Sequence, residues 1–307
     1  MTWAAITSPV ADGPAPDRWR AHALTGGAVV AAVAAAFMMG AEIGPGAQVA
    51  VLGAVLAVFG LPHGALDIVE GPRLVPPSFG RWRTPAYLAA YLAAAAVALG
   101  IWLVAPGAAL LLFLAASVLH FGVEDAPAGG RSPAWETLAR GAVPMMGPLL
   151  LQQTATLEVF GWLTGDDPVV ESLGAVIPLL AAAWALLLAA VVVRRLRPGP
   201  DGDPLVVVEI GLLLGLFAAA PPLVAFTVYF CVLHAPRHLL KESASLRHAV
   251  APTAAVAGAA GLAWLALAAT RPPEVAGAQV VFWTLSALTV PHMLQAAMTA
   301  RLTRATR

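Results

Sequence analysis

Residues 85–103 read PAYLAAYLAAAAVALGIWL, a run without a single charged side chain. A helix needs about 20 predominantly apolar residues to cross the hydrocarbon core of a bilayer, so this run is typical of a membrane-spanning helix. The rest of the chain has the same character: of its 307 residues, 60% are hydrophobic and 11% are charged, whereas soluble domains carry roughly 25% charged residues. We therefore expect an all-α integral membrane protein.

Similar apolar runs recur along the chain and predict a polytopic transmembrane helical bundle of about ten spans. We expect a flexible N-terminal tail at 1–20, a transmembrane domain at 21–300 that holds any active site, and a basic C-terminal tail at 301–307. The stretch 153–168 is expected to be irregular, as a surface turn or a half-inserted loop, and 197–204 to be a loop. The predicted spans are 22–41, 47–66, 85–103, 108–124, 134–152, 170–193, 205–219, 223–240, 251–269 and 277–299.

The basic residues predict one orientation for all ten spans. With the N-terminus in the cytoplasm, every lysine and arginine except Arg271 falls on the cytoplasmic side, Arg237 among them. Cytoplasmic segments of membrane proteins carry such an excess of positive charge. The sequence thus predicts a multi-pass protein of the cell membrane with both termini in the cytoplasm. The formal net charge is zero, so no overall basic field indicates a nucleic-acid partner.

Five of the seven histidines lie within even-numbered spans, near the ends predicted to face the cytoplasm. The first of them lies in GLPHGALD (60–67), where Gly64 leaves room beside the ring. Ionisable groups inside spans are costly and are functional candidates by default. The sequence therefore predicts that the five rings gather on the cytoplasmic side of the membrane. They are His63, His120, His234, His238 and His292.

The spacing of these residues indicates a metal site. His234 and His238 are four residues apart, so on a helix they share a face and can bind one ion together. Asp67 and Glu124 follow His63 and His120 by four residues, and each carboxylate could accept the second N–H of its ring. Imidazole ligands suit zinc, copper, iron and nickel. Four neutral histidines around an octahedral Fe(II) would leave two positions open for O₂ or water.

Other histidine sites fit less well. The chain has no H-E-x-x-H motif of a zinc protease, five clustered histidines are too few for a membrane di-iron desaturase, and bis-histidine haem ligation stays open as an alternative. A non-enzymatic transporter of transition-metal ions or protons is the second functional hypothesis, in which Glu209 would be the main acid inside a span. Against it, the histidine cluster lies toward one side, whereas transporters bind their cargo near the midplane.

Four ordered motifs resemble the Brp/Blh family of β-carotene 15,15′-dioxygenases, the membrane proteins that make retinal for microbial rhodopsins. The resemblance covers about residues 47–300, nearly the whole chain, and its most specific parts are P-H-G-A-x-D and H-x-P-R-H. The motifs are GLPHGALD (60–67), SVLHFGVED (117–125), YFCVLHAPRH (229–238) and PHM (291–293).

The resemblance implies a mononuclear non-haem Fe²⁺ and the cleavage of the central double bond of β-carotene by O₂, which gives two all-trans-retinal molecules. By position, the four implied ligands and catalytic residues are His63, His120, His234 and His238. His292 is expected next to the ligands or at the substrate, with Asp67 and Glu124 in the outer shell of the metal.

The implied substrate is a carotenoid that enters laterally from the bilayer, and the resemblance also implies a functional link to a microbial rhodopsin. A rigid polyene about as long as the hydrocarbon core is thick would pass the iron in an apolar tunnel. Candidate lining residues adjoin the motif histidines: Phe121, Tyr229, Phe230 and Met293.

Overall fold

The computed structural model describes residues 16–125, 132–165, 167–199, 201–241 and 246–305, and within these ranges all regular structure is helical. The predicted all-α class is therefore confirmed. Most of the predicted N-terminal tail lies outside the described residues.

Six helices are long and apolar enough to cross a membrane by length and composition. The ten predicted spans are all helical, but their number as membrane crossings and the side on which the termini lie stay predictions. The six helices are α1 (Pro16–Met38), α5 (Arg83–Val104), α6 (Pro106–Glu124), α10 (Pro168–Leu196), α14 (Val250–Ala268) and α15 (Pro273–Ala305).

Three other predicted spans are interrupted helices. Proline lacks the N–H that continues a helix, and Pro62, Pro144 and Pro236 lie in or next to the interruptions. The first span comprises α2 (Pro45–Val55), the π-helix η2 (Leu56–Gly60) and α3 (Leu61–Ala65). The second comprises α7 (Ala134–Gly141) and α8 (Val143–Leu151), and the third α12 (Pro222–Val228), the π-helix η5 (Tyr229–His234) and α13 (Ala235–Lys241).

The expectation for 153–168 was wrong, because most of this stretch forms the helix α9 (Gln153–Thr164). Gly165 ends α9 with a φ of 67°, in the left-handed region that glycine enters without strain. The Asp167 side chain then accepts a hydrogen bond from Val169 N and caps α10. Glycine and aspartate therefore mark only the turn, and the residues before it are buried against α6 and α15.

The remaining elements are short, apart from α11 (Pro204–Ala219). The predicted loop at 197–204 is confirmed, since α10 ends at Leu196 and α11 begins at Pro204. The short elements are α4 (Asp67–Glu70) and the 3₁₀ helices η3 (Gly71–Leu74), η4 (Pro77–Trp82) and η6 (Leu246–His248).

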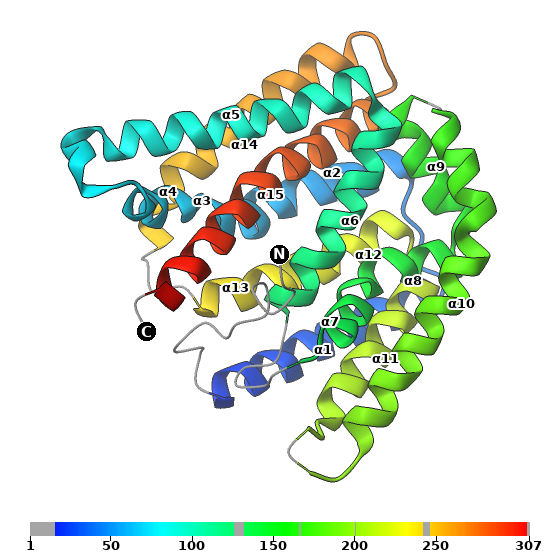
Figure 1. The fold of residues 1–307 in the computed structure, drawn as a ribbon. Helices are drawn as coiled ribbons and strands as arrows, with labels where there is room; N and C mark the ends of the chain where they lie inside the picture. The colour runs from blue at the N-terminus through cyan, green and yellow to red at the C-terminus, as the bar shows by residue number, and fades with distance from the viewer. Residues whose placement is uncertain (1–15, 126–131, 166, 200, 242–245, 306–307) are drawn as a thin grey trace.

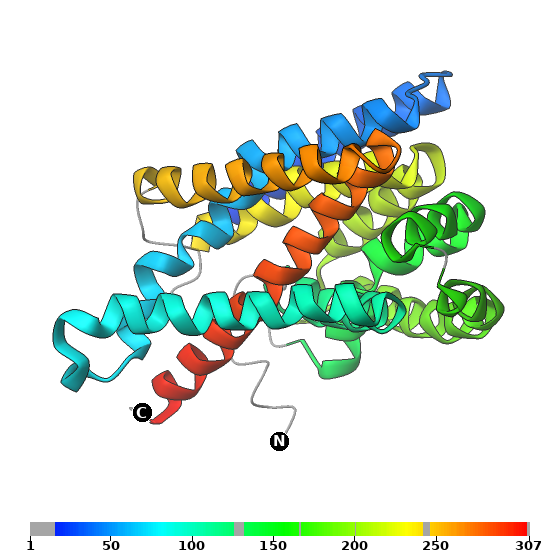
Figure 2. The same cartoon turned by 90° about the horizontal axis from the view of Figure 1, so that it is seen from above.

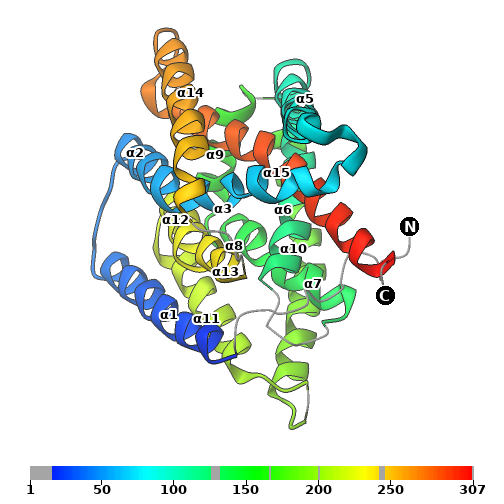
Figure 3. The ribbon, with the colours of Figure 1, turned by 90° about the vertical axis from the view of Figure 1, so that its left-hand side faces the viewer.

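Helix α15 runs through the middle of the bundle (Figure 1) and packs against α5, α14, α2, α9 and α6. Figure 2 shows it crossing obliquely between α5 on one side and α14 with α2 on the other. Helices α1 and α11 pack together at the opposite end of the molecule from α5 and α14 (Figure 3). A residue halfway along α15 can thus face several helices at once.

The close crossing of α6 and α7 fixes the part of α6 that carries His120. A Cβ atom on Gly141 would overlap the carbonyl oxygen of Val118 and the backbone of Gly122. Only glycine allows this approach of two backbones.

We expect Gly141→Ala to lower the free energy of unfolding by about 1–3 kcal/mol, as overpacking of a tight core does. The added methyl group meets backbone atoms, which cannot rotate away. Thermal unfolding in detergent, followed by circular dichroism, measures the effect. Gly258→Ala on α14 is the control, since its Cβ would meet no atom within 4 Å. Equal unfolding temperatures for the two variants would contradict the close-crossing argument.

Candidate functional site

Four buried histidines from distant parts of the chain form one cluster. His120 lies on α6, His234 ends η5, His238 lies on α13 and His292 lies on α15. The Nε2 atoms of His120 and His234 are 3.1 Å apart, and those of His238 and His292 are 3.3 Å apart. The rings of His120 and His292 join the two pairs edge to face, with centroids 5.3 Å apart. The structure thus brings together four of the five histidines singled out in the sequence.

Two buried carboxylates orient this cluster from outside. Nδ1 of His234 lies 3.1 Å from Asp125 Oδ1, and Nδ1 of His292 lies 2.9 Å from Asp67 Oδ2. A carboxylate accepts hydrogen bonds only, so in both rings Nδ1 carries a proton, and in the neutral form of each ring Nε2 carries the lone pair. The lone pairs of His234 and His292 therefore point into the cluster.

A tyrosine hydroxyl donates to each of these carboxylates. Tyr229 Oη lies 2.6 Å from Asp125 Oδ2, and Tyr91 Oη lies 3.3 Å from Asp67 Oδ2. Two hydrogen-bonded triads, each made of a tyrosine, an aspartate and a histidine, thus approach the cluster from different helices. Buried polar groups need such partners because no water is available to satisfy them.

The local sequence explains how η5 presents its histidine. The π-helices η2 and η5 pack against each other, and a Cβ on Gly60 would lie 3.0 Å from Phe230 Cε1. Each π-helix is followed within a few residues by a proline, Pro62 or Pro236. Single π-turns inside α-helices often occur at functional sites, where they change the direction of side chains. Both histidine motifs in interrupted spans have this feature.

The spacing did not predict the carboxylate partners that the structure shows. Asp67, expected beside His63, contacts His292, and the carboxylate on His234 is Asp125. The expected pairing of Glu124 with His120 stays a prediction. The spacing argument looked for partners four residues away on the same helix, whereas the observed pairs join different helices. Asp125 and Tyr91 were therefore missed.

His63 lies on α3, which packs against α13 and α15. Its side chain is outside the described part of the structure, so its role stays a prediction. Glu124 is the last residue of α6 and is half-buried.

The aromatic candidates divide into two groups. Phe121 and Phe230 pack their rings on His234, with centroid distances of 4.8 and 5.1 Å, and both line a cavity beside the histidines. Tyr229 instead uses its hydroxyl on Asp125, and Met293 is half-buried on α15. The cavity is lined by Gly60, Leu61, Gly64, Phe113, Ser117, His120, Phe121, Phe226, Phe230, Leu285, Leu288, Thr289 and His292.

This cavity is almost entirely apolar apart from its histidine wall. A Cβ on Gly64 would meet no atom within 4 Å, in agreement with the space expected beside GLPHGALD. The site therefore combines a wall of imidazoles with a small, mostly apolar cavity of about 40 Å³.

The donor set of the cluster fits a transition-metal ion. Two nitrogens that bind one ion at about 2.1 Å and at a right angle lie about 3.0 Å apart, close to the separations observed here. A ligating histidine also commonly donates its other N–H to a carboxylate, as His234 and His292 do. Among the described residues, however, the rings form pairs, and no three histidine, cysteine or acidic side chains already form a ligand set. An N–H···N hydrogen bond within each pair satisfies the same distances.

Arg237 in the H-x-P-R-H motif is buried rather than exposed at a membrane surface. Only 1% of it is accessible to solvent, and Nη1 donates to Glu209 Oε1 at 2.9 Å. Its second amino group bonds the other oxygen of the same carboxylate, and the guanidinium lies over the Trp19 ring. The side of the membrane on which Arg237 lies stays a prediction. Glu209, the acid that a transporter would use as a relay, is held by this ion pair.

Known proteins match most of the chain. A family model described as Beta-carotene 15,15'-dioxygenase matches residues 54–298. The "Beta-carotene 15,15'-dioxygenase" of the uncultured marine bacterium 66A03 is 30% identical over 253 residues, which cover 78% of this chain and 90% of that protein. The "Probable beta-carotene 15,15'-dioxygenase Blh" of Halobacterium salinarum is 31% identical, with 93% of this chain and 95% of that protein covered. No solved structure gives a significant match.

These matches confirm the resemblance that the four histidine motifs indicated. The family model includes all of the histidine motifs, and both relatives cover most of the chain. The chain therefore belongs to the β-carotene 15,15′-dioxygenase family, a family of oxidoreductases.

Proposed function

We propose that this protein cleaves β-carotene, or a close carotenoid, at the central 15,15′ double bond and releases all-trans-retinal. The observation that carries the proposal is the position of buried imidazoles on the wall of an apolar cavity in a chain of this family. In the reaction, each carbon of the broken double bond gains one oxygen atom of O₂. One carotenoid and one O₂ thus give two aldehydes, and no further reductant is needed.

The proposed cofactor is Fe²⁺, held by His120, His234 and His238 together with His63, the fourth ligand that the resemblance implies. When bound, the ion would supply the activation of O₂. Asp125 keeps the Nε2 lone pair of His234 directed into the cluster, as metal ligation requires. Phe121 and Phe230 shield the imidazoles and give the polyene an apolar surface next to them.

We also assign His292 to the metal-holding set. Its Nε2 faces that of His238 at 3.3 Å, and its Nδ1 is bound to Asp67 in the same way as Nδ1 of His234 is bound to Asp125. We further propose that the bundle spans the cell membrane ten times, with both termini and the cluster toward the cytoplasm.

Expression in β-carotene-producing bacteria tests the reaction. We expect the cells to lose their yellow colour and to accumulate retinal, and we expect His120→Ala or His238→Ala to abolish both effects. Chromatography of extracted carotenoids and retinoids is the measurement. Unchanged β-carotene in cells that contain well-expressed, iron-loaded protein would overturn the substrate assignment.

Asp125→Asn should weaken iron binding by about 10- to 100-fold, the usual cost of losing an outer-shell carboxylate. The amide keeps the shape of the side chain but no longer favours the Nδ1–H tautomer of His234. Iron content after titration against a chelator measures the change. Glu124→Gln is the matched control on the adjacent residue, with an affinity expected to stay within about twofold. A larger loss for Glu124→Gln would favour the pairing that the sequence spacing indicated.

His292→Ala should lower the iron content of the purified protein as well as its activity, because it removes an imidazole that faces His238. Elemental analysis per mole of protein is the measurement, and His248→Ala, outside the cluster, is the control. Full iron occupancy with lost activity would instead place His292 at the substrate.

A further inference from the structure

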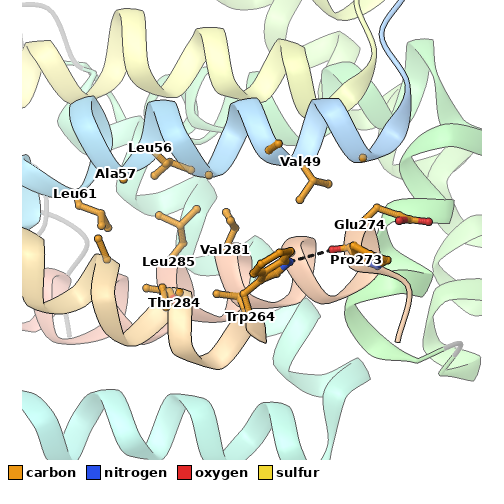
Figure 4. A pocket seen from close by; sticks show the side chains of 18 residues that line it. Val49, Leu56, Ala57, Leu61, Trp264, Pro273, Glu274, Val281, Thr284 and Leu285 are labelled. Atoms are coloured by element: carbon orange, nitrogen blue, oxygen red, sulfur yellow. Dashed lines mark hydrogen bonds between the residues drawn. The ribbon is translucent and has the colours of Figure 1, made fainter. Parts of the chain in front are cut away.

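A long groove lies beside the histidine cavity, between α2 with η2, α14 and α15 (Figure 4). It encloses about 330 Å³, within the ~300–1,000 Å³ range of small-molecule sites. We call it the α14 groove. Figure 4 shows it extending from Ala57, Leu61 and Leu285 at one end to Trp264 and Glu274 at the other.

The α14 groove and the histidine cavity are adjacent. Leu61 and Leu285 line both of them, so one end of the groove lies next to the cavity that His120 and His292 line. Along α2, η2 and α3 its wall extends from Gly46 to Leu61, which corresponds to roughly 22 Å at the helical rise per residue. A polyene about as long as the ~30 Å hydrocarbon core has halves of about 15 Å. The groove is therefore long enough for one half.

The walls of the groove are suited to a hydrocarbon from the bilayer. Nearly all lining groups are apolar, and the one charged side chain, Glu274, lies at the end away from the histidines. The outer wall is α14, which is described in full and buries none of its residues. It turns Ala257 and Gly261 toward the groove, while Leu262 and Leu265 are exposed on its surface. Only this helix separates the groove from the lipid on that side.

A second apolar chamber adjoins the histidine cavity. Phe113 and Phe226 line both spaces, and the chamber lies among α6, α8, α9, α12 and α15. The histidine cavity encloses about 40 Å³ and this chamber about 50 Å³, so both are much smaller than the α14 groove.

We propose that the α14 groove binds one half of the carotenoid and is its entrance from the bilayer. This inference rests on the proposed function. The ring at the end of the substrate lies toward Trp264, and the polyene extends past Leu61 and Leu285 toward the histidines. The length of the groove then contributes to placing the central double bond at the histidines.

Gly261→Leu tests the groove. A Cβ on Gly261 would meet no atom within 4 Å, so leucine fits without a clash but fills the groove between Ala257 and Trp264. Gly258→Leu is the matched control: it is on the same helix, is also exposed and open, and does not line the groove. The substrates are β-carotene and β-apo-8′-carotenal, which keeps one full half and has a truncated second half.

We expect Gly261→Leu to lower kcat/KM for β-carotene at least tenfold and to retain most of the activity on β-apo-8′-carotenal. Metal-free Gly261→Leu protein should also retain less β-carotene through purification, as visible absorbance measures. Gly258→Leu should match the wild type in every assay.

Wild-type activity on β-carotene in Gly261→Leu protein would overturn the groove assignment and leave the groove as a site for lipid chains only. Equal losses on both substrates would also overturn it, since a truncated half should still fit. An iron-loaded wild-type protein that cleaves neither substrate would overturn the proposed function itself, which distinguishes that failure from a failure of the groove.

Discussion

The bundle depends on one constraint: an imidazole cluster buried in an apolar interior must have its ring nitrogens satisfied by the protein. Asp67 and Asp125 meet this need for His292 and His234, and Tyr91 and Tyr229 meet it in turn for the carboxylates. An unpaired buried charge costs several kcal/mol, so neither aspartate can be buried without its partners. These hydrogen-bonded tyrosine–aspartate–histidine triads therefore fix the relative positions of α4, η5, α15 and the end of α6.

Interrupted helices are what make this arrangement reachable. A straight helix presents side chains at a fixed 100° step, and the two π-helices change that step beside the cluster. Irregular backbone is tolerated in a membrane only where neighbouring protein groups cover it, and η2 and η5 cover each other. The Gly60–Phe230 contact lies at this junction. The same interruptions leave the space that becomes the histidine cavity, so the irregular backbone and the site have one origin.

The sequence predicts where the helices of this protein lie better than it predicts which side chains contact one another. Hydropathy locates the helices because the bilayer imposes a length on apolar runs. The position of His120, His234, His238 and His292 in even-numbered predicted spans correctly indicates that they lie close together. It does not predict Asp125 as the partner of His234, because that pair spans 109 residues and depends on how helices pack. The helix α9 was missed for a related reason: Gly165 and the aspartates after it gave a turn signal that outweighed the weak helical pattern before it. Hydropathy also does not predict the burial of Arg237, because that depends on its pairing with Glu209 inside the bundle.

The site separates two requirements that conflict in most proteins. A carotenoid needs an apolar cavity, whereas a metal needs polar ligands held at fixed angles. Here the hydrogen-bonded triads hold the cluster through Nδ1 of His234 and His292. The cavity lies against the rings of His120 and His292. Hydrogen bonds to carboxylates strengthen in such water-poor surroundings, so the apolar chamber also makes the imidazoles more rigid. Because the imidazoles are held from behind, Phe121 and Phe230 are free to give the cavity an apolar wall. In the proposed reaction, the length of the α14 groove can then contribute to the choice of bond without any polar contact to the substrate.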